Sequence, residues 1–292
     1  MDRSVARLNV PQNIVGESPR WDAARGRLLY VDIFSKALHS YDPVTQAHEQ
    51  WDMGELIGFW VPTVDGRYLV GGQSGIFYFD SDTQMKTPFV GLEADDPGTR
   101  CNDARCDSTG RLWVSTMAVD GEPRPPVGSL YSVDPDGSVQ AHLTDICIGN
   151  SLVCTPDETA LYFSDTPTGV GWRYRYDVAT GSISEGAACF TPTEAALPDG
   201  GCLDADGAIW IALANGKRLE RRSLDGALLE TVALPCQHPT MCGFGGPTLS
   251  EMYVTSFARH LDAEGRRAQP HEGAVYTLDV GRQGVPEAQF GA

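Results

Sequence analysis

The feature that most constrains the fold of this 292-residue chain is an internal repeat. Each copy has a turn that carries Asp, Gly or Pro, followed by an apolar and aromatic run that ends in small or polar residues. The six copies are ARGRLLYVDI (24–33), VDGRYLVGGQ (64–73), STGRLWVSTM (108–117), PDETALYFSD (156–165), ADGAIWIALA (205–214) and TLSEMYVTSF (248–257). Successive copies lie about 39 to 49 residues apart. Such turns before β-rich runs are typical of β-hairpins.

A second strand-like run follows each copy, as in GIFYFDSDT, GSLYSVDPDGS and WRYRYDVATGS. A period of this length with about four strands per unit is typical of a β-propeller blade. Six units occupy nearly the whole chain, so the repeat predicts an all-β, six-bladed β-propeller that spans residues 1–292 as a single domain. The N-terminal SVARLNV (4–10) is expected to pair with the last unit. A pair of β-sandwiches is the alternative, but it does not explain so regular a period.

The composition limits the partners of this chain. Its net charge is −17 and its pI is near 4.6, so long-range repulsion opposes binding to nucleic acid or to anionic membranes. The simplest explanation of this charge is a well-solvated surface. No apolar run has the length of a signal peptide or a membrane span, so we expect a cytoplasmic protein. None of the 8 cysteines forms a C-x-x-C pair, and in the cytosol they are expected to be reduced.

Four polar residues stand in phase with the repeat. They lie 11 to 13 positions before the aromatic residue of their unit and are Glu17, Asn102, Asn150 and Asp199. The second and sixth units have the apolar or small stretches LIGFWV and TMCGFGG instead. Equivalent positions of propeller blades converge on the axis, so the four side chains would offer hard oxygen ligands to a divalent cation. Taken singly, each could also be a turn former.

At these residues the chain resembles the senescence marker protein/gluconolactonase (regucalcin-like) family of six-bladed propellers. The resemblance covers essentially the whole chain and includes the motifs GESPRWD, LLYVDI, RCNDARCDSTGRLWVSTM, GSLYSVDPDG, IGNSLVCTPD, LYFSDT, LPDGGCLDADGAIWIA and CGFGGPTLSEMYVTS. The most specific matches are Gly16-Glu17-Ser18-Pro19, Arg100-x-Asn102-Asp103 and Pro198-Asp199-Gly200.

The resemblance implies that Glu17, Asn150 and Asp199 are the protein ligands of one divalent metal cation, which could be Ca, Zn, Mn, Mg or Fe. Ser151 follows the asparagine where Gly is commoner in the family, a departure that is expected to alter the local turn more than the ligand.

The resemblance also assigns substrate contacts. These fall on Arg100, Asn102 and Asp120. Many relatives carry Glu at the position of Asp120, so the shorter side chain bears on which sugar is preferred.

The implied function is the metal-dependent hydrolysis of a sugar-acid lactone, such as a glucono-, galactono-, xylono- or arabinonolactone, to the free acid. Asp199 is expected to act as general base as well as ligand, since the motifs contain no other titratable base. Arg100 and Asn102 would hold sugar hydroxyls or stabilise the oxyanion. The chain has no G-x-S-x-G motif, which argues against a serine hydrolase.

Two alternatives stay open. The first is a non-catalytic propeller that binds calcium or serves as an interaction platform. The second is a promiscuous metal-dependent esterase or organophosphate hydrolase that uses the same residues. For either function we expect a monomer or a weak homo-oligomer.

The stretch RCNDARC (100–106) poses a separate question, because Cys101 and Cys106 could form a thiolate metal site, form a disulfide or only pack. No second cysteine pair or in-phase histidine supports a zinc site. If Asn102 faces the channel, strand alternation turns Cys101 away from it to pack between blades. Asp103 is a candidate brace for the neighbouring loop, with no substrate contact assigned.

Overall fold

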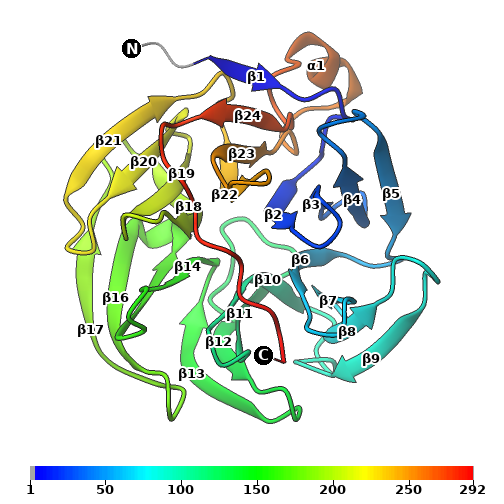
Figure 1. Ribbon diagram of the computed structural model, residues 1–292. Helices are drawn as coiled ribbons and strands as arrows, with labels where there is room; N and C mark the ends of the chain where they lie inside the picture. The colour runs from blue at the N-terminus through cyan, green and yellow to red at the C-terminus, as the bar shows by residue number, and fades with distance from the viewer. Residues whose placement is uncertain (1–3, 292) are drawn as a thin grey trace. The chain divides into compact units, whose positions relative to one another are not determined.

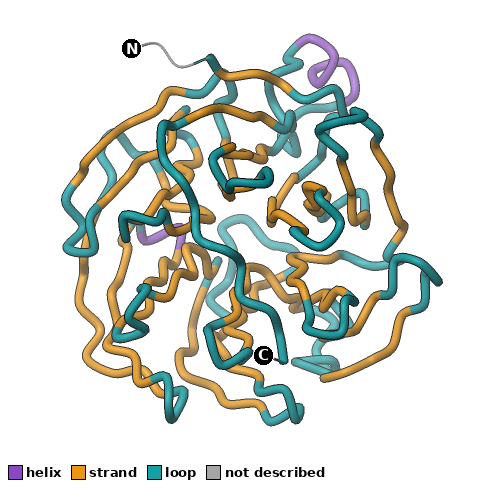
Figure 2. The backbone as a smooth tube through the Cα atoms, viewed as in Figure 1, coloured by secondary structure: helices purple, strands orange, loops and turns teal. Residues whose placement is uncertain are grey.

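The computed structural model describes residues 4–291, which contain twenty-four strands, the short helix α1 (Ala263–Ala268) and the 3-10 turn η1 (Thr166–Thr168) (Figures 1 and 2). The strands form six four-stranded antiparallel sheets. This confirms the prediction of an all-β, six-bladed β-propeller. Two compact units divide the chain, unit 1 being Met1–Gly54 with Pro192–Pro286 and unit 2 being Glu55–Thr191 with Glu287–Ala292.

Unit 1 holds three of the sheets. The first contains β2 (Gly16–Asp22), β3 (Arg27–Asp32), β4 (Ala37–Tyr41) and β5 (His48–Asp52). The second contains β18 (Leu197–Leu203), β19 (Ile209–Ala214), β20 (Arg218–Arg222) and β21 (Leu228–Ala233). The third contains β22 (Pro239–Gly245), β23 (Glu251–Ser256), β24 (Tyr276–Asp279) and β1 (Val5–Arg7). Val5 pairs with Leu278, which confirms that the N-terminal segment joins the last unit of the repeat.

Unit 2 holds the other three sheets. The first contains β6 (Ile57–Pro62), β7 (Tyr68–Gly72), β8 (Ile76–Phe79) and β9 (Lys86–Val90). The second contains β10 (Thr99–Cys106), β11 (Leu112–Ala118), β12 (Gly128–Val133) and β13 (Val139–Ile146). The third contains β14 (Gly149–Cys154), β15 (Ala160–Asp165), β16 (Val170–Asp177) and β17 (Ser182–Phe190).

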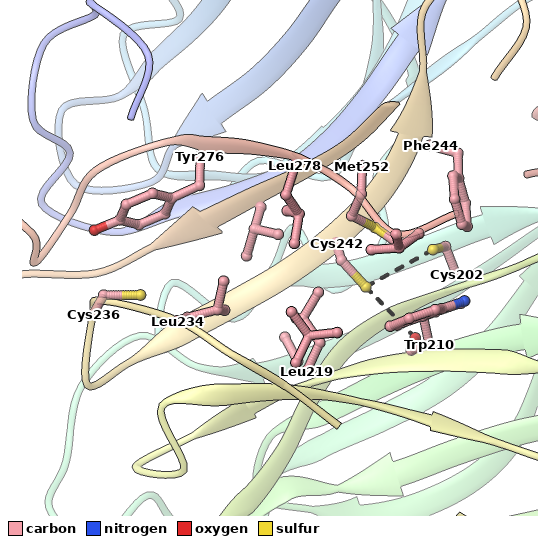
Figure 3. Close-up of a cluster of buried hydrophobic side chains, with 14 of the residues drawn as sticks. Cys202, Trp210, Leu219, Leu234, Cys236, Cys242, Phe244, Met252, Tyr276 and Leu278 are labelled. Carbon is pink, nitrogen blue, oxygen red and sulfur yellow. Dashed lines mark hydrogen bonds between the residues drawn. The ribbon is translucent and has the colours of Figure 1, made fainter. Parts of the chain in front are cut away.

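The repeated aromatic residues form the cores of the sheets. They stand on the second strand of each sheet and are at most 2% exposed, as for Trp113 and Trp210. In unit 1, Trp210 packs with Phe244, Cys202 and Cys242 in one apolar cluster (Figure 3). All eight cysteines are free thiols, including Cys202 and Cys242, whose Sγ atoms lie 3.8 Å apart. No cysteine pair therefore forms a disulfide.

The first strand of every sheet carries a shift of register, and this feature positions the polar residues. The shifts lie between Glu17 and Arg20, Ile57 and Phe59, Cys101 and Ala104, Asn150 and Val153, Pro198 and Gly201, and Pro239 and Cys242. A bulge leaves residues without a ladder partner and re-aims their side chains. The backbone groups it frees need partners from elsewhere in the fold.

No helix among residues 4–291 is long and apolar enough to cross a membrane. The expectation that residues 1–292 behave as a single domain stays a prediction.

Candidate functional site

All four polar residues predicted from the repeat lie at these bulges. Glu17 and Asn150 are the last ladder-paired residues before the shift, opposite Val31 and Ser164. Asn102 and Asp199 come one residue later, after the paired Cys101 and Pro198. The four are thus in phase only to within one residue. The sequence carried this signal, since Asn102 and Asp199 stand 11 positions before their aromatic residue while Glu17 and Asn150 stand 13 and 12 before theirs.

In unit 2 the structure brings three predicted residues into one hydrogen-bonded cluster. The Asn102 amide Nδ2 donates to Asn150 Oδ1 at 3.2 Å and to the Gly149 carbonyl oxygen at 3.0 Å. The Arg100 guanidinium donates to Asn102 Oδ1 at 2.9 Å and lies 3.1 Å from the Met117 sulfur. Arg100, Asn102 and Asn150 are all buried, at 6%, 9% and 4% exposure. The side chains are therefore fixed by one another rather than by solvent.

The orientation of the Asn150 amide follows from its two partners. Its Nδ2 donates to Thr166 Oγ1 at 2.9 Å, so its Oδ1 is the atom turned toward Asn102. An amide oxygen has two lone pairs, and the Asn102 hydrogen bond uses one. The second can bind a cation, as a hard oxygen ligand does. Sequence reasoning missed Thr166, although it ends the motif LYFSDT directly after the fourth repeat strand.

Asp103 braces the neighbouring strand. Its Oδ2 accepts the Leu152 backbone N–H at 3.2 Å, and its Oδ1 accepts the Ala104 N–H at 2.8 Å. Ser115 on β11 adds a further link, because its hydroxyl donates to the Gly149 carbonyl at 2.7 Å. These bonds connect β10 and β11 to the part of β14 that carries Asn150.

Glu17 and Asp199 lie in unit 1. Glu17 is partly buried and its Oε2 accepts the N–H of Ser18, a residue whose φ is 54°. Asp199 is 8% exposed. It precedes Gly200, where a Cβ atom would come within 2.5 Å of the Met241 side chain. The glycine therefore allows β18 to approach β22 closely at the position of Asp199.

Asp120 is the predicted site residue that differs from the rest. It is exposed and lies on a bend directly after β11, whereas Arg100, Asn102 and Asn150 are buried.

The two cysteines of RCNDARC are packing residues. Cys101 is 1% exposed and joins an apolar cluster with Phe59 and Val114, and Cys106 is in the same cluster. Burial, and then the charge of Glu93, raises the pKa of the Cys101 thiol to about 12, so the thiol stays neutral at physiological pH. Among residues 4–291, no group of three or more His, Cys, Asp or Glu side chains is arranged to hold a metal ion.

Comparison with known proteins gives a consistent result. The family model described as "SMP-30/Gluconolactonase/LRE-like region" matches residues 15–258. Regucalcin of Danio rerio is 32% identical over 282 residues, which cover 96% of this chain and 95% of the relative. The "Putative sugar lactone lactonase YvrE" of Bacillus subtilis (strain 168) is 29% identical over 284 residues, which cover 94% and 95%. The crystal structure of a calcium-binding protein, regucalcin, from Agrobacterium tumefaciens str. C58 superposes with a TM-score of 0.93 at 28% identity, covering 100% of this chain and 98% of the other.

Proposed function

This chain belongs to the SMP-30/gluconolactonase/LRE-like family, and from this premise we propose that it hydrolyses a sugar-acid lactone to the free acid with one bound divalent metal cation. The relative named a putative sugar lactone lactonase and the gluconolactonase-like family model support the reaction class. The regucalcin structure described as calcium-binding supports the cation.

The observation that carries the proposal is the buried Arg100–Asn102–Asn150 cluster. Burying a guanidinium costs free energy unless the group is bonded, and a structural role would be met more cheaply by apolar residues. The equivalent stretch of β22 is largely apolar, so the fold itself does not require polar residues there. The cluster is therefore best explained by the recognition of a polar ligand.

We assign the cation to Glu17, Asn150 and Asp199. The set contains two carboxylates and one carboxamide, which suit a hard divalent cation, and the Asn150 amide already presents its oxygen as the acceptor atom. When bound, such a cation acts as a Lewis acid on the lactone carbonyl.

The other roles fall to side chains of the chain itself. Asp199 is the general base that takes the proton of the attacking water. Arg100 is pre-oriented by the carbonyl of Cys101, 2.8 Å away, and by Asn102, and it donates to the oxyanion or to a sugar hydroxyl. Asp120, on its exposed bend, accepts a hydrogen bond from a substrate hydroxyl. The shorter reach of aspartate makes this residue a determinant of which sugar is preferred.

The test is acid release from a panel of five- and six-carbon aldonolactones, followed with a pH indicator. Each lactone is run with calcium, manganese or zinc, and again after EDTA. We expect at least one lactone to be hydrolysed in a metal-dependent way. Absence of metal-dependent acid release from the whole panel would remove the lactonase proposal. Tight metal binding without hydrolysis would favour the non-catalytic calcium-binding alternative.

Variants separate the roles. Asp199→Asn is expected to abolish turnover, and Arg100→Met to lower kcat/KM by about 100-fold, the usual loss for a donor to a developing oxyanion. Asp134→Asn is the matched control, because it removes a half-buried carboxylate that pairs with Arg111 elsewhere in unit 2. Full activity of Asp199→Asn would show that the assigned base is wrong.

A further inference from the structure

The bulge in β14 leaves two residues without a ladder partner. Asn150 pairs with Ser164 and Val153 pairs with Tyr162, so neither Ser151 nor Leu152 has a ladder partner on β15. Leu152 is 1% exposed, so water cannot satisfy its backbone groups. The conformation of the bulge, and with it the position of Asn150, therefore depends on what binds the N–H and C=O of Leu152.

Both groups are bound by side chains of β10. Asp103 Oδ2 accepts the N–H at 3.2 Å, and Arg105 Nε donates to the carbonyl oxygen at 2.8 Å. These two buried side chains hold Leu152 from one side of the bulge. Because Arg105 is cationic, its own position depends on a countercharge.

That countercharge comes from the C-terminal end of the chain. Arg105 Nη1 donates to both carboxylate oxygens of Glu287, at 3.2 and 3.1 Å, and the two side chains are 10% and 15% exposed. A charge-assisted pair of this kind is stronger than a neutral hydrogen bond. The Arg105 guanidinium thus bridges the Glu287 carboxylate and the Leu152 carbonyl oxygen.

The segment that carries Glu287 is itself held against unit 2. The Phe290 N–H donates to the Pro62 carbonyl at 2.9 Å, and the Phe290 carbonyl accepts the Val64 N–H at 3.1 Å. The Phe290 ring is 2% exposed and packs edge-on against Phe89 at 5.5 Å. Residues 287–291 therefore form a segment, here called the strap, that Phe290 fixes to the rest of unit 2.

We propose that this strap positions Asn150, with Glu287 and Arg105 as positioning residues that act through the Leu152 carbonyl. The proposal deepens the proposed function and rests on it, since Asn150 matters as a ligand only if the cation binds. Glu287 and Arg105 contact neither cation nor substrate, and their part is to fix the backbone from which the Asn150 amide projects.

The experiment compares full-length wild type, E287Q, R105M and D134N. Calcium affinity is measured by titration calorimetry, and hydrogen exchange is measured on the peptide that covers residues 149–154. E287Q removes the countercharge at constant shape, and we expect about tenfold weaker calcium binding, the usual loss when a partner of a ligand is removed. R105M keeps the apolar stem but loses the hydrogen bond to the Leu152 carbonyl and the ion pair with Glu287. Its calcium affinity should therefore fall at least as much.

In both variants the Leu152 amide is expected to exchange faster than in wild type. D134N, which breaks another arginine–carboxylate pair of unit 2 with an N–O distance of 2.8 Å, should change neither quantity. A merely structural role of the strap would lower the melting temperature but leave calcium affinity and the exchange of residues 149–154 as in wild type, and that result would overturn the proposal.

The two proposals fail separately. If wild type binds no calcium, manganese or zinc, the proposed function falls, and the exchange data alone decide on the strap. Faster exchange in E287Q and R105M but not in D134N supports the strap, and equal exchange in all four proteins overturns it.

Discussion

In unit 2, β10 lies against β14, and in unit 1, β22 lies against β2. We call these two strand contacts joints. In each joint, one strand contacts the residue that lies two positions after a predicted ligand on the other strand. That residue is Leu152 after Asn150 and Pro19 after Glu17. Leu152 has both backbone groups bound by the side chains of Asp103 and Arg105.

Pro19 packs closely against β22. Proline has no N–H to satisfy, and its carbonyl oxygen lies only 2.1 Å from where a Cβ on Gly243 would stand. Gly243 is opposite Tyr253 in its sheet, as Arg105 is opposite Trp113 in its own, so the two residues occupy equivalent positions. Between β10 and β14, charged side chains bind the backbone groups that the bulge leaves unpaired. Between β22 and β2, a proline removes the N–H donor, and the two backbones pack closely against each other.

The register shift therefore recurs in the first strand of every sheet, whereas the groups that support it differ between β14 and β2. The hydrogen-bonded joint can be altered by a distant residue, since Arg105 depends on Glu287, 182 positions away. At Pro19 the contact between β22 and β2 depends on close packing, while the Thr240 hydroxyl of β22 donates to the Gly16 carbonyl further along β2.

Gly243→Ala should have the largest effect on stability. Its Cβ would collide with the Pro19 carbonyl, and backbone cannot move away cheaply, so we expect a loss of about 3 kcal/mol. Denaturant unfolding measures it, with Gly91→Ala as control, since its Cβ would come no closer than 3.3 Å to the Ala94 side chain. Equal stability of the two variants would show that the β22–β2 joint is not close-packed.

Asp103→Leu should cost about 2 kcal/mol, because it leaves the buried Leu152 N–H without an acceptor. Met241→Leu, at the equivalent position of β22, should cost less than about 1 kcal/mol, because Pro19 has no N–H to lose a partner. Urea unfolding of both variants measures the two losses in the free energy of unfolding. Similar losses would contradict the difference between the joints.

The apolar side of β10 predicts a pH effect. Burial raises the pKa of Cys101 to about 12, while the unfolded thiol titrates near its ordinary value of 9.0. The unfolded chain therefore loses this proton first, so the stability that Cys101 provides is full below pH 9 and is lost as the pH rises toward 12. The stability gap between wild type and Cys101→Ala should narrow by about 1.4 kcal/mol between pH 8 and pH 10. Parallel pH curves would show that the thiol is not buried as described.

Ser151→Gly should have the smallest effect. Ser151 has a φ of 56°, a left-handed conformation that glycine adopts without strain, although glycine loses more entropy on folding. We expect a net stabilisation of about 0.5 kcal/mol with unchanged calcium affinity, measured by thermal unfolding and calorimetry. Destabilisation would mean that the Ser151 hydroxyl contributes more than the backbone strain costs.

Much of the fold could be predicted from the sequence, because each blade repeats its own turn and strand chemistry. The copy around Trp113 and the copy around Trp210 both place a fully buried indole on the second strand of a sheet. The pairing of Val5 with Leu278 followed from the same count of strands. Asn102 and Asn150 could be identified because they stand in phase with the repeat, whereas Arg100 was assigned only by the resemblance to the family.

The partners of those residues could not be predicted. Thr166 orients the Asn150 amide, and Asp103 and Arg105 hold Leu152, but these bonds depend on which backbone groups a bulge leaves unpaired. Local sequence determined where the strands, turns and candidate ligands lie, because turn and strand preferences act over a few residues. Which side chains hold the ligands in place depends on the tertiary structure, because a buried N–H donates to, and a buried C=O accepts from, whichever partner the neighbouring sheet brings within hydrogen-bonding distance.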